Sequence, residues 1–312
     1  MARVVFFGTP EFGVPVLRAL SRRHQIVAVV TQPDRPYGRG RSQVRMSPVK
    51  VAALEAGVER ILQPVRLRRD RETVQALREL GADVFCLAAY GQLLPAEVLT
   101  IPAHGTIGVH ASLLPKYRGA APVAAALLHG EEVTGVSLML TDEGMDTGPI
   151  IAQCALPIAP RDTAETLSDK LAHLGAELLI DTLPAWLAGR IEPRAQDEEA
   201  ATYAPLLERE AGAIDWAQSA VQLDRQIRAY TPWPGSFCSY RGQRLKILAA
   251  HPLPTWRGEG RPGQVVEVGG EIAVITGEGA LVLDRVQMAG RRAVSAQDFV
   301  RGQRDFVGGI LA

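Results

Sequence analysis

The sequence predicts two domains: an α/β domain with a mostly parallel sheet, and a small antiparallel β-barrel after it. A length of 312 residues exceeds what most single hydrophobic cores support. The first half alternates short apolar runs with amphipathic stretches, which is typical of strands joined by helices. The last third has short alternating runs punctuated by glycines, which is typical of a small barrel. A polar, acidic stretch separates the two patterns, so we expect domains at 1–189 and 205–312 and a linker at 190–204.

The first domain is expected to begin with a strand at 4–7 and, after a Gly-Thr-Pro turn, a helix at 14–23. Ser47 followed by Pro48 predicts the start of a second helix, because serine caps helix N-termini and proline suits the first helical turn. Further strands are expected at 26–30, 82–88, 107–110 and 136–140, and helices at 48–56, 70–80, 120–128 and 163–187. Ligands of such sheets bind at the carboxyl ends of the strands, so we expect the functional site there.

The second domain is expected to contain one helix, at 218–230, followed mostly by short strands. The strands are expected at 236–240, 244–249, 264–268, 271–276 and 280–286. Glycines lie between the last three of them at turn positions, which predicts tight antiparallel connections.

Composition excludes several classes of protein. A hydrophobic fraction of 47% argues against disorder, and no apolar run reaches the roughly 18 residues that a membrane helix needs. The 34 basic and 34 acidic residues balance, which argues against a protein that coats nucleic acid through bulk charge. Cys86, Cys154 and Cys238 are widely spaced among apolar residues, as reduced thiols are, rather than forming a disulfide framework or a zinc site. We therefore expect a cytoplasmic protein without a metal.

The most informative residue is His110, which ends an apolar strand just before the turn at 112–115. A lone histidine is more often structural than catalytic, but an acidic loop at 141–148 follows the next predicted strand. A right-handed crossover would bring the carboxyl ends of these two strands to one edge of the sheet, so Asp146 is expected to face His110. A carboxylate beside an imidazole fixes its tautomer and suits it to acid and base chemistry. The alternatives are a solvated turn or a calcium loop, although the acidic spacing does not fit the EF-hand pattern.

Seven segments, in order and across nearly the whole chain, resemble the methionyl-tRNA formyltransferase family. They are FFGTPEFGVPVL, QPDRPYGRGR, AAYGQLLP, VHASLLPKYRGAAP, TGVSLMLTDEGMDTGPI, GAIDWAQSA and IRAYTPWPGSF. The resemblance implies a Rossmann-like formyltransferase domain and an OB-like β-barrel that helps hold tRNA, in an enzyme of translation initiation. It also implies 10-formyltetrahydrofolate as formyl donor and initiator methionyl-tRNA as acceptor. We expect the protein to act as a monomer.

The chemistry of formyl transfer agrees with this resemblance. When an α-amino nitrogen attacks the formyl carbon, the carbonyl oxygen becomes an oxyanion, so catalysis needs a hydrogen-bond donor at that oxygen and a proton shuttle between nitrogens. The resemblance implies that His110 and Asp146 are two of the three catalytic groups. It implies folate contacts along one cleft, at Ser112, Leu113, Leu114, Pro115, Tyr90, Gly91, Gln92 and Leu93.

The third catalytic residue of the family is an asparagine two positions before the histidine, and Gly108 stands at that position. The family's amide donates a hydrogen bond to the formyl oxygen, which glycine cannot do. Losing one such donor typically costs roughly 10²–10³ in turnover, about 3–4 kcal/mol. A water in the vacated volume, a variant with impaired activity, or selection against asparagine, which is absent from the whole chain, would each account for Gly108. Thr106 shares the strand face but lies about 7 Å further back, so it is a poor substitute.

The loop at 32–45 is long for a strand-to-helix connection and strongly basic. By resemblance it is a finger that enters the acceptor stem of the tRNA and contacts phosphates, and the alternative is a solvated loop without structure. Its cations are Arg35, Arg39, Arg41 and Arg45.

Two smaller sets of residues lie near the expected site. Phe12 and Val14 follow the turn at Gly8, which is neither a dinucleotide nor a phosphate-binding motif. They are expected to border a pocket for the methionine side chain, with core packing as the alternative. Lys116 and Arg118 are expected either to steer substrate phosphates or to be solvated at the rim.

Two other functions remain open at this stage. The first is a formyltransferase of the same fold that acts on a sugar-nucleotide amine or a ribonucleotide glycinamide, which the basic finger and the barrel disfavour. The second is a catalytically impaired protein that binds tRNA or folate, which Gly108 motivates.

Overall fold

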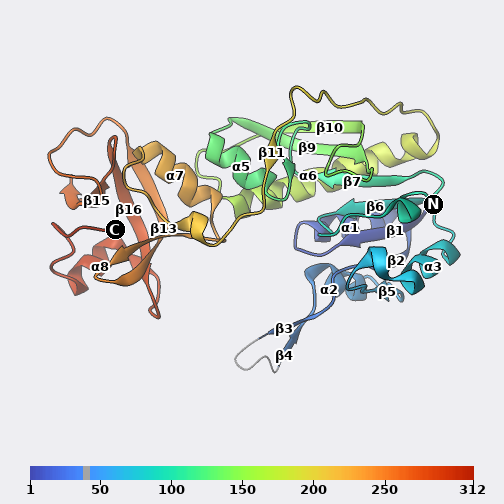
Figure 1. The fold of residues 1–312 in the computed structure, drawn as a ribbon, viewed down its shortest axis with the longest axis horizontal. Coiled ribbons are helices and arrows are strands. Elements are labelled where there is room, and N and C mark those ends of the chain that lie inside the picture. The colour runs from blue at the N-terminus through green and yellow to red at the C-terminus, as the bar shows by residue number, and fades with distance from the viewer. Residues whose placement is uncertain (38–42) are drawn as a thin grey trace. The chain divides into compact units, whose positions relative to one another are not determined.

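The computed structural model describes residues 1–37 and 43–312, without the side chains of residues 37 and 43. Its contacts divide the chain into two compact units, which are described separately (Figure 1). The first unit comprises Met1–Pro122, Val133–Pro157 and Ser168–Ala204, and the second comprises Val123–Glu132, Ile158–Leu167 and Pro205–Ala312.

The first unit is built on a sheet that has seven strands within the described residues. Their order is β10 (Ile150–Pro157), β9 (Val133–Leu140), β7 (Thr106–His110), β6 (Val84–Ala88), β1 (Arg3–Gly8), β2 (Gln25–Val30) and β5 (Ile61–Leu62). The five strands from β7 to β5 are parallel to their neighbours. β9 runs antiparallel to β7, and β10 antiparallel to β9. The predicted α/β domain with a mostly parallel sheet is therefore confirmed, with an antiparallel excursion at one edge.

Most helices of the first unit begin within two residues of the predicted positions, whereas the short helix Ala96–Leu99 is not among those predicted. The helices are α1 (Gly13–Arg23), α2 (Pro48–Glu55), α3 (Arg71–Glu79), the short α4 (Ala96–Leu99) and most of α6 (Ala164–Leu187), while α5 (Pro122–His129) falls almost wholly in the second unit. The Ser47 hydroxyl caps α2 by accepting a hydrogen bond from the Lys50 amide at 3.1 Å, and Pro48 is the first helical residue. The Asp70 carboxylate caps α3 in the same way, at 2.9 Å from the Thr73 amide. These caps define the first residues of the two helices.

Two short strand pairs lie outside the main sheet. β3 (Arg35–Tyr37) and β4 (Gln43–Arg45) are antiparallel and flank residues 38–42. β8 (Arg118–Gly119) and β11 (Tyr203–Ala204) are parallel, and they join the segment after His110 to the end of the predicted linker.

The second unit is an antiparallel β domain, as the sequence predicts. Among the described residues its order is β12 (Ser236–Tyr240), β13 (Gln243–Leu253), β16 (Ala280–Met288), β15 (Glu271–Ile275) and β14 (Val265–Val268), with β17 (Val294–Ser295) paired to β16. α7 (Ala220–Ala229) buries Leu223 and Ile227 in a core shared with Leu245 and Leu283, and α8 (Ala296–Gly302) adds Phe299. These apolar faces hold the sheet and its two helices together.

A segment that the periodicity did not assign, 308–312, connects the two outer strands of this sheet. Ala312 exchanges two backbone hydrogen bonds with Ser239 of β12, and the Leu311 amide donates to the Gly263 carbonyl beside β14 at 2.8 Å. The ends of the sheet are thereby joined through backbone pairing. Within the described residues, no helix is long and apolar enough to cross a membrane.

Candidate active site

The segment after β7 is held against the sheet by one buried serine. Ser137 of β9 lies opposite His110 in the strand register, and its hydroxyl donates to the Ser112 carbonyl at 2.7 Å and accepts from the Leu114 amide at 2.9 Å. The Gln153 amide donates both to that hydroxyl and to the Leu114 carbonyl. A cis peptide bond joins Leu114 to Pro115. The Ser112 to Pro115 turn, which is the predicted folate segment, therefore has a defined conformation beside His110.

His110 and Asp146 lie next to each other, as the sequence analysis expects. The imidazole Nδ1 is 3.5 Å from Asp146 Oδ2, and the two side chains are only 8% and 20% exposed. The imidazole Nε2 is 2.9 Å from the Tyr117 carbonyl oxygen, which can only accept, so Nε2 carries a hydrogen. Nδ1 is then the ring nitrogen without a backbone partner here, and it faces the Asp146 carboxylate. Asp146 is held in place by the Gly119 amide, which donates to Oδ2 at 2.8 Å.

The predicted reason for this proximity is wrong. β7 and β9 are antiparallel, with Ile107 opposite Leu140, so β9 ends beside the beginning of β7 rather than beside His110. A right-handed crossover between parallel strands is therefore not what joins them. Asp146 reaches His110 because the 141–149 loop between β9 and β10 returns toward the far end of β7, with Asp146 itself at a positive φ of 56°.

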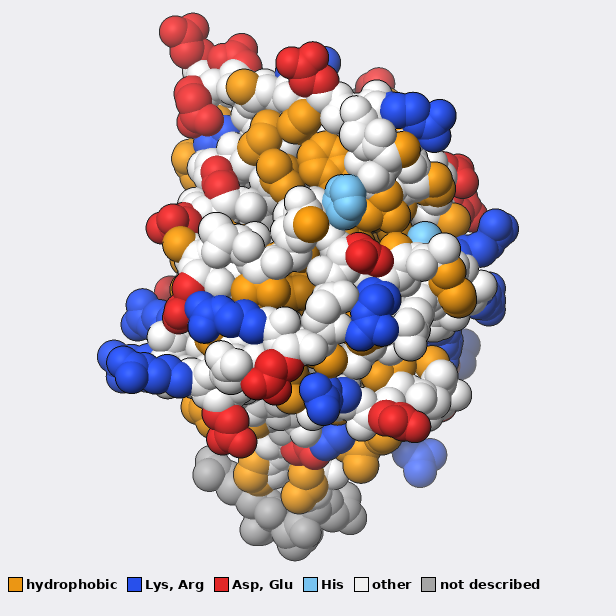
Figure 2. All heavy atoms as spheres, turned by 90° about the vertical axis from the view of Figure 1, so that its right-hand side faces the viewer, with side chains coloured by type: hydrophobic (Ala, Val, Ile, Leu, Met, Phe, Trp, Pro, Cys, Tyr) orange, Lys and Arg blue, Asp and Glu red, His pale blue; other side chains and the backbone are white. Residues whose placement is uncertain are grey.

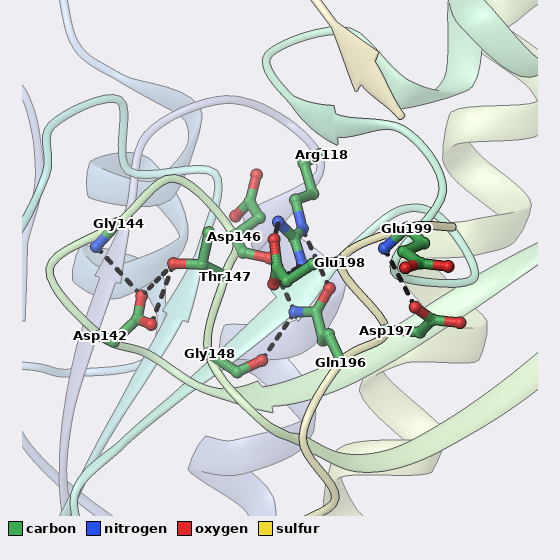
Figure 3. Close-up of polar contacts among 10 residues, drawn as sticks. All are labelled: Arg118, Asp142, Gly144, Asp146, Thr147, Gly148, Gln196, Asp197, Glu198 and Glu199. Carbon is green, nitrogen blue, oxygen red and sulfur yellow. Dashed lines mark hydrogen bonds and ion pairs between the residues drawn. The ribbon is translucent and has the colours of Figure 1, made fainter. Parts of the chain in front are cut away.

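The loop that carries Asp146 is fixed by a network that sequence reasoning missed (Figure 3). The Gln196 side-chain amide donates to the Asp146 and Gly148 carbonyls at 2.8 and 2.7 Å. Its oxygen accepts from Arg118 at 3.1 Å, and Arg118 also forms a bidentate pair with Glu198 at 2.7 and 2.9 Å. Hydrogen bonding to Arg118 lowers the pKa of Glu198, and hydrogen bonding to Glu198 raises the pKa of Arg118. The expectation that Arg118 is a rim cation is wrong, because its side chain is fully buried and paired.

The predicted linker supplies the other half of this network. Residues 190–204 run along the first unit, where the Arg194 and Ile150 backbones pair. The Thr202 hydroxyl accepts from the Tyr117 amide at 2.8 Å, and its carbonyl accepts from the Arg118 amide at 2.8 Å. The connection between the domains thus also braces the segment that follows His110.

Gly108 lies on the same face of β7 as His110, two residues earlier, and is buried. Its backbone is not in the left-handed region, so a side chain is conformationally allowed. A Cβ added there would lie 3.0 Å from the Thr141 hydroxyl oxygen and 3.1 Å from the Met139 Cε. The structure therefore places the Thr141 hydroxyl where a short side chain at position 108 would extend.

A hollow of about 430 Å³ opens beside this point. It lies between α4 and the start of the 141–149 loop, and its lining residues are Ala96, Leu99, Thr100, Thr141, Asp142, Glu143 and Gly144. Its lining is apolar at Ala96 and Leu99 of α4 and polar at the loop. The Asp142 carboxylate accepts hydrogen bonds from the Gly144 amide and the Thr147 hydroxyl, which keeps this part of the loop in a fixed turn (Figure 3).

The Tyr90 to Leu93 segment precedes α4 and is predicted to line the folate cleft. The side chains of Tyr90 and Gln92 instead contact other parts of the first unit. The Tyr90 ring is 1% exposed and packs edge-on against Phe7 at 5.5 Å between ring centroids, and burial raises its pKa. The Gln92 amide group bonds to the backbone of 64–67. Gly91 has a φ of 86°, and Leu93 is 58% exposed. Leu93 is thus the side chain of this segment that is available to a ligand.

The predicted methionine pocket and the basic loop meet at a different hollow, of about 550 Å³. Val14 and Arg45 both line it, along with the apolar Val44, Met46 and Val51. It shares no lining residue with the hollow at Thr141, and Phe12 is half-buried without lining either.

Arg35 and Arg45 are exposed and face each other across the β3–β4 pair, whereas Arg39 and Arg41 lie outside the described residues. The base of this pair is anchored by Asp34, whose carboxylate lies 2.6 Å from the Lys50 ammonium. Hydrogen bonds from Lys50 and Gln63 lower the pKa of Asp34. On the face shown in Figure 2, basic and acidic side chains are interspersed, with hydrophobic side chains gathered between them, as the balanced net charge suggests.

Comparison with known proteins gives matches over most of the chain. Residues 2–183 match the formyl transferase family model, and residues 206–304 match the model of the formyl transferase C-terminal domain. The chain is 50% identical over 302 residues to a methionyl-tRNA formyltransferase of Thermus thermophilus, covering 96% of each chain. It is 46% identical over 303 residues to one of Myxococcus xanthus, covering 97% of this chain and 95% of that one.

Solved structures at lower identity share the fold. An N-formyltransferase of Helicobacter canadensis, in complex with folinic acid and dTDP-3-aminofucose, aligns with a TM-score of 0.68 at 19% identity, over 92% of this chain and all of that one. HypX of Aquifex aeolicus, in complex with tetrahydrofolic acid, aligns with a TM-score of 0.66 at 18% identity, over 98% of this chain and 48% of that one.

Proposed function

Because the chain belongs to the methionyl-tRNA formyltransferase family, we propose that it transfers a formyl group from 10-formyltetrahydrofolate to the α-amino group of methionyl initiator tRNA. The observation that carries this proposal is the buried His110 and Asp146 pair at 3.5 Å, beside the braced Ser112 to Pro115 turn. The loop that carries Asp146 also lines the hollow at Thr141. The reaction forms a bond between the amino nitrogen and the formyl carbon, and it breaks the bond between that carbon and N10 of the folate. One proton leaves the attacking nitrogen, and one is delivered to N10.

The His110 and Asp146 pair supports the proton transfers. His110 Nδ1 takes the proton from the attacking nitrogen, since its partner Asp146 stabilises the resulting imidazolium, and returns it to the leaving nitrogen. Nε2 keeps its hydrogen bond to the Tyr117 carbonyl throughout, so the ring stays oriented. The Gly119 amide holds the Asp146 carboxylate, and Gln196 holds the Asp146 backbone carbonyl. The site therefore needs little reorganisation during the reaction.

The residues that we assign to the folate fit a flat, partly apolar molecule. The hollow at Thr141 has Ala96 and Leu99 on α4 and the Asp142 to Gly144 turn at its edge. Leu93 shortly precedes α4 in the chain, and the Ser112 to Pro115 turn shortly follows His110. Apolar walls would bury the pterin ring, and backbone and carboxylate groups would bond to its polar edge.

We further propose that turnover is limited at Gly108, because no side chain at that position donates to the formyl oxygen. The consequence is a lower kcat without loss of substrate binding, since none of the contacts that we assign to folate and tRNA involves position 108.

We assign the tRNA to the basic finger and the second domain. Arg35, Arg39, Arg41 and Arg45 would contact acceptor-stem phosphates, which predicts weaker binding at higher salt. The domains are then 1–189 for catalysis and 205–312 for tRNA, in a cytoplasmic monomer. Val14 and Phe12 are assigned to the methionine side chain.

Formyl transfer to two acceptors tests this function. Purified protein and 10-formyltetrahydrofolate are mixed with methionyl initiator tRNA or with a UDP-4-amino sugar, and the formylated product is quantified. We expect product with the tRNA and none with the sugar. Activity with the sugar alone would overturn the assignment in favour of a sugar N-formyltransferase, a class that shares this fold at 15–19% identity.

A further inference from the structure

The hydroxyl of Thr141 is a buried polar group that the described fold leaves unused. Among the residues that the structure describes, it has no hydrogen-bond partner. The Thr141 backbone is nevertheless fixed, because its amide donates to the Thr106 carbonyl at 2.7 Å. Buried hydroxyls are usually paired, so an unpaired one is a candidate for a ligand contact only where its position also points to one.

The position of this hydroxyl points to such a contact. Its oxygen lies 3.0 Å from the point that a Cβ of residue 108 would occupy. The terminal atoms of a short amide side chain lie about 2.4 Å from Cβ by standard bond lengths. The hydroxyl therefore reaches the same neighbourhood that an amide at position 108 would reach. Thr141 also lines the hollow of about 430 Å³, so this residue contacts both that hollow and the space beside Gly108.

The neighbouring catalytic groups do not fill this role. His110 Nε2 donates to the Tyr117 carbonyl, and Nδ1 faces Asp146. Nε2 is committed to that carbonyl and Nδ1 to the proposed proton transfer, so a separate donor is needed where negative charge develops on the formyl oxygen.

We propose that the Thr141 hydroxyl donates a hydrogen bond to the formyl oxygen in the transition state and so replaces part of what Gly108 cannot supply. This inference rests on the proposed function and adds a catalytic residue to it. The hydroxyl has no competing acceptor among the described residues, and its oxygen is buried, so the proposed contact requires the formyl group to enter the space beside Gly108. A single hydroxyl beside a glycine is a weaker donor arrangement than an amide projecting from the strand, so turnover remains limited.

Thr106 provides a matched control. Its hydroxyl is also buried and also unpaired within the described residues, and it lies on the same face of β7. It does not line the hollow, and it is about 7 Å further along the strand from Gly108. A purely structural effect of removing a buried hydroxyl would therefore affect both threonines, whereas a catalytic effect is specific to Thr141.

The test compares Thr141→Val, Thr141→Ser and Thr106→Val with the wild-type chain in steady-state formyl transfer to methionyl-tRNA. Valine keeps the shape of threonine and removes the donor. We expect Thr141→Val to lower kcat by about tenfold or more, within the range for one oxyanion donor, while both KM values stay within about twofold. Thr141→Ser should retain most of kcat, and Thr106→Val should match the wild type. Thermal unfolding of each variant checks that the fold is intact.

A second pair of variants separates chemistry from structure. In a Gly108→Asn background the amide takes over the donor role, so Thr141→Val should then change kcat by less than about threefold. An unchanged kcat for Thr141→Val in the wild-type background would overturn the inference, as would the same loss in both backgrounds. If the wild-type chain forms no formylmethionyl-tRNA, the proposed function fails first and this inference fails with it.

Discussion

Replacing Gly108 by asparagine should raise turnover, and the structure shows why the substitution can be accommodated. The backbone of Gly108 is that of an ordinary strand residue, so asparagine needs no strained φ. The new Cβ would lie 3.0 Å from Thr141 Oγ1 and 3.1 Å from Met139 Cε, which is tight by a few tenths of an ångström. Met139 Cε is the end of a flexible side chain and can move, whereas Thr141 is branched and must rotate or shift.

The expected magnitudes follow from these contacts. Overpacking of this kind costs about 1–3 kcal/mol of stability, which lowers the Tm of a domain of this size by a few degrees. One well-placed oxyanion donor is typically worth about 10²–10³ in kcat, or about 3–4 kcal/mol. Thr141 is proposed to supply part of this transition-state stabilisation already. We therefore expect Gly108→Asn to raise kcat by at least about tenfold, or about 1.4 kcal/mol, and by no more than about 10²–10³.

The assay is steady-state formation of formylmethionyl-tRNA from 10-formyltetrahydrofolate, with kcat and both KM values measured for Gly108→Asn, Gly108→Ala and Gly108→Asp. Alanine adds the same Cβ without the amide, and aspartate adds the same shape with an acceptor in place of the donor. Only asparagine should raise kcat, and aspartate should lower it because its charge repels the developing oxyanion. Equal kcat values for the wild type and Gly108→Asn would show that the missing amide does not limit turnover, as would an equal gain from alanine.

Three further predictions concern other parts of the chain. Charge reversal at Arg39 and Arg41 together should raise the KM for tRNA and flatten its salt dependence, with the KM for folate unchanged; an unchanged KM for tRNA would exclude the finger from binding. Gln196→Ala should lower kcat by about tenfold through the two hydrogen bonds it removes from the Asp146 loop. The KM values of Gln196→Ala should change little. A normal kcat would show that the Asp146 loop keeps its conformation without the Gln196 side chain. Titration of the folded protein with a thiol reagent near neutral pH should modify one cysteine, because burial raises the pKa of the other two to about 12. The half-buried Cys154 should react, whereas Cys86 and Cys238 should be protected in the folded protein. All three thiols should react after unfolding. Rapid reaction of Cys86 or Cys238 in the folded protein would contradict this prediction.

Local patterns predicted much of the secondary structure, because hydrophobic periodicity and helix caps act over a few residues. The Ser47-Pro48 start of α2 is an example, since cap and first turn are encoded in adjacent residues. The direction of β9 could not be predicted in this way. A run of buried residues has the same pattern whichever way it points. The strand expected at 136–140 as one more parallel strand is part of β9, which is antiparallel to β7. β10 was missed for a related reason, because its outer half is only partly buried and shows no strong alternation.

The candidate site was predicted unevenly for similar physical reasons. His110 and Asp146 stand beside glycines and prolines that mark a turn, so sequence could single them out. Arg118 and Gln196 carry no such signal, since arginine is rarely buried and a glutamine within an acidic stretch is typical of solvated chain. Their role depends on a contact between residues 78 positions apart. The Thr141 hydroxyl likewise gains its meaning only from the glycine that the fold brings beside it.

The central claim, that formyl transfer takes place at His110 and Asp146, is tested most directly by single-turnover transfer of labelled formyl to methionyl-tRNA. His110→Ala and Asp146→Asn would be compared with the wild type at saturating substrates. Either change should lower the single-turnover rate by about 10²–10⁴, the range for a positioned acid and base, while tRNA and folate still bind. A His110→Ala protein that transfers formyl at the wild-type rate would contradict this claim.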